Sequence, residues 1–148
     1  MLLNLNTDPR DHSACALSYD DEARWMRGVW KGHVDQAEAM RGAEAYLRHA
    51  TQRPCAYLLN DNSRLVGTWF ESLEWLLHVW VPQAERVGLR YVAHVVQADQ
   101  HHDIFTRQHK VPLPFELQIF HNPEDATHWL ASMRDAEEAK QERESTTR

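Results

Sequence analysis

The chain has few cysteines and glycines, the residues on which disulfide frameworks and nucleotide-binding loops depend. Cysteine occurs only twice, at Cys15 and Cys55, each time within a short apolar run. These positions indicate small core side chains in a reducing compartment rather than a disulfide framework. Glycine occurs five times, and neither a G-x-G-x-x-G fingerprint nor a Walker pattern is present. Their absence argues against a nucleotide-binding enzyme and its cofactor.

Basic residues and long apolar runs are also scarce. Lys and Arg total 16 against 22 Asp and Glu, which gives a formal net charge of -6 at pH 7. Binding to nucleic acid depends on clustered basic side chains, so the composition argues against a nucleic-acid partner. No stretch approaches the roughly 18 uninterrupted apolar residues of a membrane span. The start, MLLNLNTDPRD, lacks the basic segment of a signal peptide. We therefore expect a cytoplasmic protein without a membrane span.

Local patterns predict strands that alternate with helices. Alternating side chains favour strands over 14–19 and 23–31, joined by an acidic turn into a hairpin. Apolar residues three or four apart favour helices over 34–50, 70–87 and 122–133, and apolar runs favour buried strands over 55–59, 90–96 and 115–120. Pro82 should kink or interrupt the second helix, because proline cannot donate a helical hydrogen bond.

The order of these elements predicts an α/β fold. We expect a mixed, mostly parallel five-stranded sheet with an N-terminal β-hairpin and with helices packed mainly on one face. The length suits a single domain, which we place at residues 1–134. Charged residues dominate 135–148, and this C-terminal tail is expected to fray into solvent.

A polar junction follows the strand predicted at 55–59. It predicts a loop over residues 60–67, in which Asn60, Asp61 and Asn62 turn the chain and bond to its own backbone. Ser63, Thr68 and Ser72 follow near the predicted start of the next helix, and a helix N-terminus favours a phosphate group. Phosphorylation of one of these residues is therefore a second interpretation, although Asp61 and Glu71 would repel the added charge.

Several segments, taken in order, resemble one bacterial family. They are Trp30-Lys31-Gly32, Asn60-Asp61-Asn62, Trp75, Trp80-Val81-Pro82 and residues 88–93. This ordered set is similar to the SpoIIAA-like, STAS-type small bacterial proteins and covers roughly residues 14–133. The resemblance implies a STAS-like fold and a non-enzymatic, regulatory role.

In the broader family, a kinase phosphorylates a serine just after a strand, and this switch controls the binding of a protein partner. The family pattern is Asp-Ser-Ser-Gly, where this chain has Asp61-Asn62-Ser63-Arg64. The resemblance thus implies a kinase or regulator as a partner, with Ser63, Thr68 and Ser72 as candidate switch residues.

Six tryptophans support a different interpretation. Trp69, Trp75 and Trp80 flank the polar junction. An aromatic wall with few polar groups is typical of a pocket for a small hydrophobic ligand or lipid, which would make the domain a carrier or sensor. The same rings could simply fill the core. Trp75 and Val79 also form a second apolar face on the predicted helix, which could contact a partner or a second copy in a homodimer.

Metal binding and catalysis have weaker support. One polar loop contains His101, His102, Asp103 and His109, and imidazole nitrogens and a carboxylate are suitable ligands for zinc, nickel or copper. No HExxH or CxxC pattern accompanies them, so a solvated loop without a metal is the alternative. His94, in the middle of a predicted strand, is interpreted as a core or edge histidine. The chain lacks a G-x-S-x-G motif and a recognisable group of nucleophile, base and orienting residue, so we expect no enzymatic activity.

Overall fold

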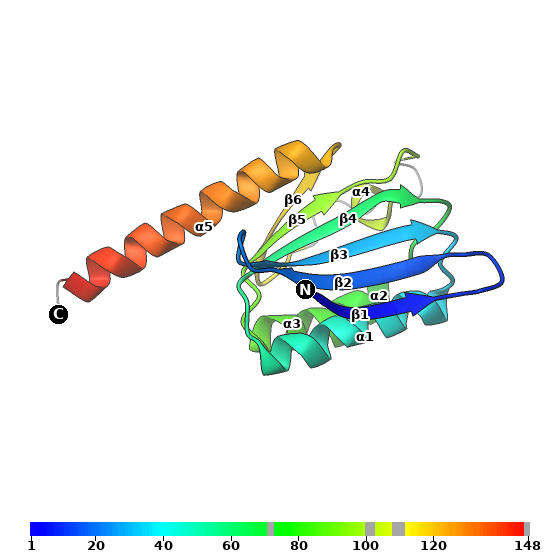
Figure 1. The fold of residues 1–148 in the computed structure, drawn as a ribbon, viewed down its shortest axis with the longest axis horizontal. Helices are drawn as coiled ribbons and strands as arrows, with labels where there is room; N and C mark the ends of the chain where they lie inside the picture. The colour runs from blue at the N-terminus through cyan, green and yellow to red at the C-terminus, as the bar shows by residue number, and fades with distance from the viewer. Residues whose placement is uncertain (71–72, 100–102, 108–111, 147–148) are drawn as a thin grey trace.

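The computed structural model describes residues 1–70, 73–99, 103–107 and 112–146. A six-stranded sheet, ordered along the chain, forms its centre (Figure 1). The strands are β1 (Leu2–Thr7), β2 (Ala14–Asp20), β3 (Trp25–Gly32), β4 (Tyr57–Leu65), β5 (Tyr91–Val95) and β6 (Glu116–Phe120). Strands β1 to β3 pair antiparallel, and β3 to β6 pair parallel. The predicted mixed sheet and its hairpin are confirmed.

Strand β1 raises the number of strands from the predicted five to six. Its sequence, LLNLNT, contains one β-branched residue and no aromatic ring, and two asparagines interrupt the apolar pattern. Such a segment has low strand propensity. It pairs only with β2, at the edge of the sheet, and Leu2 and Leu5 stay exposed. Pairing with a neighbouring strand, rather than local preference, thus makes this segment a strand.

The helices cover the two faces of the sheet unequally. They are α1 (Gln36–Gln52), α2 (Leu73–Trp75), the π-helix η1 (Leu76–Trp80), α3 (Val81–Arg86), α4 (Ile104–Arg107) and α5 (Pro123–Thr146). Figure 1 shows α1, α2 and α3 along one face, and α5 packs on β4, β5 and β6 on the other. The prediction that helices lie mainly on one face is therefore confirmed.

The single helix predicted at 70–87 is divided into three parts. The π-helix η1 separates α2 from α3, and the Val81 N–H donates to the Leu76 carbonyl, five residues earlier. Pro82 follows at the start of α3, where its missing N–H is best tolerated. The expected interruption near Pro82 is confirmed, and its form is a π-helix, which often marks a functional site.

The prediction of a frayed C-terminal tail was wrong. Helix α5 continues through the charged segment to Thr146. Two contacts hold its middle against the sheet: Glu138 pairs with Arg24 at 2.7 Å, and the Tyr91 hydroxyl donates to Glu137 at 2.8 Å. The bond to Glu137 raises the pKa of Tyr91 to about 12. The segment is rich in Ala, Glu, Lys and Arg, which favour a helix. The prediction of fraying relied on the high charge of the segment and did not weigh this helix propensity.

Helix α1 approaches the sheet closely at Gly42. A Cβ atom at this position would lie 2.5 Å from Cη2 of Trp30 and 3.0 Å from Sγ of Cys15. Both neighbours are buried in the core, so neither can move away freely. A glycine in the middle of a helix normally weakens it. Here the lack of a side chain is what allows α1 to contact β2 and β3.

We expect Gly42→Ala to destabilise the protein. Overpacking a core costs about 1–3 kcal/mol, which exceeds the gain of up to about 1 kcal/mol from better helix propensity. Urea denaturation followed by far-UV circular dichroism measures the change in the free energy of unfolding. Glu44→Ala, at an exposed position of the same helix, is the control and should change stability by less than about 0.5 kcal/mol. An unchanged or more stable Gly42→Ala variant would contradict the packing at this site.

Candidate functional site

A small cavity lies between the sheet and the helical layer of α1, η1 and α3. Its volume is about 70 Å³. That is several times the ~10–15 Å³ that one water needs, and about half of the ~150 Å³ of an apolar cavity that binds benzene. Side chains from β2 to β6 form its floor, and Phe105 of α4 closes one side. The cavity is therefore smaller than one that binds benzene, and a guest of that size requires the lining side chains to move.

The alternation of side chains along the strands produces this floor. Leu17, Leu58 and Val92 occupy positions of β2, β4 and β5 that point toward the helices. Three small residues are among those that line the cavity: Gly28 on β3, and Gly42 and Ala43 on α1. The cavity thus arises where small residues on a strand and on a helix both line the same space.

The π-helix supplies part of the opposite wall. Leu76, Leu77 and Trp80 line the cavity. The Trp80 indole N–H donates to the Ala43 carbonyl at 3.0 Å, which joins η1 to α1. The Trp80 ring also packs against Tyr46, with ring centroids 5.5 Å apart. The wall is therefore both apolar and fixed to its neighbour.

A chain of buried polar side chains closes one end of the cavity. The Trp30 indole N–H donates to Oδ1 of Asn60 at 2.9 Å. Nδ2 of Asn60 lies 3.0 Å from Nδ1 of His94, and Nε2 of His94 lies 2.7 Å from Oδ2 of Asp103. All four side chains are buried, and Asp103 is fully inaccessible. The chain crosses from β3 to β4 and β5 and ends at the residue before α4.

The direction of these bonds follows from Trp30. An indole N–H can only donate, so it holds the Asn60 oxygen toward β3 and the Asn60 amide nitrogen toward His94. Nδ1 of His94 must then accept, which places the proton of the neutral ring on Nε2, where it donates to the Asp103 carboxylate. The prediction that His94 is a satisfied core histidine is confirmed, and both of its ring nitrogens are occupied.

The polar junction is a strand and not a loop, so the loop predicted at residues 60–67 was wrong. Strand β4 runs through it to Leu65, and Asn60, Asp61 and Asn62 are all buried. The pairing with β3 slips by one residue after Asp61, which produces a β-bulge. Oδ1 of Asp61 accepts the Ser63 N–H at 2.9 Å. The expected bond from a junction side chain to the backbone is present, but it shapes a bulge instead of a turn.

Alternation divides the junction between the two faces of the sheet. Asn60 faces the helical layer, where it also donates to Oδ1 of Asn62 at 3.1 Å. Asp61 faces the other side, 3.8 Å from the guanidinium of Arg27. The three residues therefore do not share one face of the sheet.

Two of the candidate switch residues, Ser63 and Thr68, do not lie at a helix start. Ser63 is exposed within β4, and Thr68 is exposed in the connection that follows it. A phosphate on Ser63 would therefore not meet the positive end of a helix, and the electrostatic argument for that site was wrong. Ser72 lies outside the described residues, as do His101, His102 and His109. Among the residues that are described, no group of three His, Cys, Asp or Glu could hold a metal ion.

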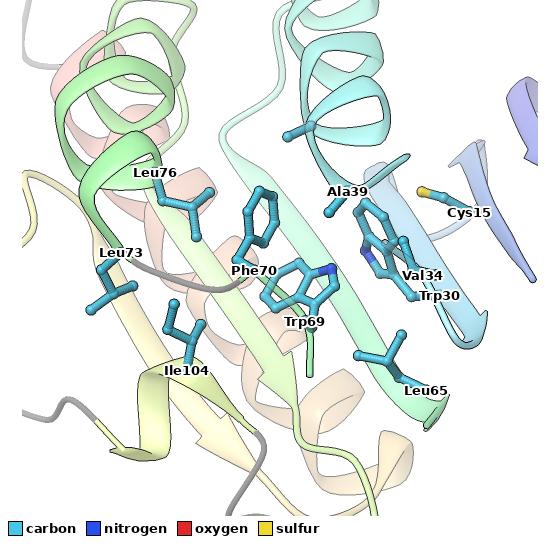
Figure 2. Packing of buried hydrophobic residues seen from close by; sticks show 11 residues of the cluster. Cys15, Trp30, Val34, Ala39, Leu65, Trp69, Phe70, Leu73, Leu76 and Ile104 are labelled. Carbon is cyan, nitrogen blue, oxygen red and sulfur yellow. The ribbon is translucent and has the colours of Figure 1, made fainter. Parts of the chain in front are cut away.

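The three candidate aromatics have different environments. Trp69 is buried, lines the cavity and contacts both Trp30 and Phe70, as Figure 2 shows. Trp80 lines the cavity from the helical side. Trp75 does not line it and stacks on Phe70 with centroids 5.9 Å apart. Val79, on the second apolar face, is 40% exposed. A contact of that face with a partner or a second copy stays a prediction.

Two residues important for the cavity were not predicted. Tyr46 occurs in a helical pattern as one more apolar residue, and nothing local shows that it borders a cavity. Asp103 was considered only as a metal ligand beside the histidines of the 101–109 loop, whereas its carboxylate bonds to His94 of β5. A signal for Asp103 was His94 itself, a histidine in the middle of an apolar strand. A buried imidazole needs hydrogen-bond partners, and these have to come from elsewhere in the chain.

No helix in the described part of the chain is both long and apolar enough to cross a membrane. No family model and no curated protein matches this sequence. A solved structure that is similar belongs to an uncharacterized protein of the DUF3478 family, with a SpoIIAA-like fold, from Shewanella loihica PV-4. The similarity covers 84% of this chain and 98% of that one, with a TM-score of 0.52 and 14% identity. At this identity the likeness concerns the fold alone. The resemblance seen in the sequence is confirmed at that level: this chain has the SpoIIAA-like α/β fold.

Proposed function

We propose that this domain is a non-enzymatic binding protein for a small, mainly apolar molecule held between the sheet and the helices α1 and η1. The observation that carries the proposal is the cavity of about 70 Å³ with almost wholly apolar, largely aromatic walls. A concave space with a mainly apolar lining is the usual form of a site for a small hydrophobic ligand. Of the two functions expected from the sequence, the geometry favours the carrier or sensor.

The chemistry of the lining supports binding over catalysis. Cys15 is a potential nucleophile at the cavity, but burial raises the pKa of its thiol to about 12, so the reactive thiolate does not form near neutral pH. His94 has both ring nitrogens engaged and cannot act as a free base toward a guest. These two groups contribute to the wall and not to a reaction.

The size of the cavity limits the guest. An apolar molecule of about the size of benzene would fill it after small movements of the lining side chains. In the η1 wall, the Trp80 indole is held to α1 by its bond to the Ala43 carbonyl, whereas the side chains of Leu76 and Leu77 are apolar and make no hydrogen bond. We therefore place the adjustment at Leu76 and Leu77.

Binding of benzene to the full chain tests the proposal. Methyl groups of Leu58 and Val92, followed by NMR, should shift with benzene and saturate. Val92→Phe fills the cavity and should weaken this binding at least about tenfold, since the guest and the new ring would occupy the same volume. Ile119→Phe, on β6 at a position that does not line the cavity, should leave it unchanged.

The milder Val92→Ile variant covers the case in which Val92→Phe fails to fold, and it should weaken binding to a smaller extent. Mass spectrometry of organic extracts of the purified protein provides an independent readout of a natural guest. Absence of saturable shifts with benzene and with xenon, together with empty extracts, would refute the binding function.

A further inference from the structure

Two glycines line the cavity, and packing explains one of them. At Gly42 of α1 a Cβ atom would lie 2.5 Å from the Trp30 ring, so the close approach of helix and sheet requires a glycine there. At Gly28 of β3 a Cβ atom would lie 3.6 Å from Oδ1 of Asn60 and 3.9 Å from Nε1 of Trp30, which are ordinary van der Waals distances. The surrounding atoms therefore leave room for a side chain at Gly28.

The backbone at Gly28 does not require a glycine either. The glycines with positive φ are Gly32, Gly67 and Gly88, and Gly28 is not one of them. It sits in the middle of β3 and pairs with Leu17 of β2 and Asn60 of β4. A glycine inside a strand weakens it, and such a glycine often marks a place where a ligand or another backbone approaches closely. A bound guest is thus a reason for this glycine that packing and conformation do not supply.

The space beside Gly28 belongs to the cavity. Gly28 lies on the face of β3 that carries the large buried side chains of Met26 and Trp30, two positions before and after it. Its strand partners Leu17 and Asn60 also line the cavity. Among the described residues, chain neighbours aside, only Asn60 and Trp30 have atoms within 4 Å of the Cβ position, so no side chain of the helical layer fills it. The missing side chain leaves a recess in the cavity floor.

The polar atoms beside this recess already have partners. Oδ1 of Asn60 accepts the Trp30 indole N–H, and Nδ2 of Asn60 bonds to His94 and Asn62. No lysine, arginine, aspartate or glutamate is among the described residues that line the cavity. A charged guest would lose its hydration without gaining a counter-charge. The recess therefore suits an uncharged, apolar part of a guest, and selection there depends on size and not on hydrogen bonding.

We infer that Gly28 is the specificity-determining residue of this cavity. The guest lies directly on the β3 backbone at Gly28, and the absent side chain sets the largest guest that the cavity admits. The inference rests on the proposed binding function and adds that selection is by size, for an uncharged guest. It also accounts for a residue that weakens a strand in the middle of β3.

Gly28→Ala tests the inference in the full chain, because it adds one methyl group at the recess. The variant should fold at least as stably as the wild type, since the new Cβ meets no close contact. Its dissociation constant for benzene, from NMR of the Leu58 and Val92 methyl groups, should rise at least about fivefold, because guest and methyl compete for one space. Xenon is smaller and should lose less affinity. Val29→Ile, on the opposite face of the same strand and away from the cavity, is the control and should change neither value.

A measurement on the wild type places the guest without a variant. Nuclear Overhauser effects should connect bound benzene to the Hα atoms of Gly28, and contacts to the methyl groups of Leu58 and Val92 without any to Gly28 would overturn the inference. If the wild type binds neither benzene nor xenon, the binding function itself fails. If Gly28→Ala binds both probes as tightly as the wild type, binding stands and the role of Gly28 is refuted. A Gly28→Ala variant that does not fold would show that the fold itself needs this glycine, which also refutes it.

Discussion

Replacing His94 by leucine is expected to lower the free energy of unfolding by about 3–5 kcal/mol, the usual cost of leaving a buried charge without its partner. The Asp103 carboxylate, which is fully buried, would lose the imidazole N–H that it accepts at 2.7 Å. The Asn60 amide would at the same time lose its acceptor at Nδ1 of His94. Chemical denaturation at neutral pH measures the effect.

Two further variants show whether the buried charge is the cause. His128→Leu, an exposed histidine on α5, should change stability by less than about 0.5 kcal/mol. The double variant His94→Leu/Asp103→Leu should lose clearly less than the sum of the two single variants, because it has no carboxylate left to bury. Losses that simply add would mean that the two side chains stabilise the fold independently.

Trp69→Ala is expected to destabilise the protein by a similar amount, about 3–5 kcal/mol, because a large buried ring is removed and its space stays partly empty. Trp69 contacts Trp30 and Phe70, and it also packs on His94 and Phe105 with centroids 5.8 Å and 6.2 Å away. The new space would join the existing cavity, since Trp69 is part of its wall. Thermal and urea unfolding provide the measurement.

A small molecule that fills the enlarged cavity should restore part of the lost stability of Trp69→Ala. Indole has the shape of the deleted ring and should raise the stability of Trp69→Ala in a concentration-dependent way, because it binds only the folded state. Trp75→Ala is the matched control: its ring is half-buried and outside the cavity, so the loss should be smaller and indole should not restore it. Equal stabilisation of the wild type by indole would show that the rescue is not specific to the deleted ring.

The sequence predicted most elements whose pattern is local. The hairpin over residues 14–31 follows from alternation around an acidic turn, and β2 and β3 pair there as expected. Helix α1 begins after Asp35, whose side chain accepts the Glu38 N–H at 2.8 Å, as the spacing of these acids indicates. In each case the residues that decide the structure are neighbours in the chain.

The errors concern residues whose partners are distant in the sequence. Asn60 was assigned to a loop because asparagine is common in turns, yet here it is buried in a strand. The cost of burying the Asn60 amide is offset because Trp30 and His94, which are 30 and 34 residues away, form hydrogen bonds with it. A pocket beside Trp69, Trp75 and Trp80 was predicted, and Trp69 and Trp80 do line the cavity. Its other walls could not be predicted, because a local pattern shows that a residue is buried but not what space remains beside it.

The π-helix gives this wall a way to change by insertion or deletion. One turn of η1 holds an extra residue compared with an α-helix. Loss of one residue around His78, whose side chain is exposed, would restore ordinary helical spacing ahead of Pro82 and rotate Leu76 and Leu77 relative to the sheet. Deletion of one codon would thus change the shape of the cavity wall that η1 forms. The sheet and helix α5, which packs on its other face, would keep their sequences.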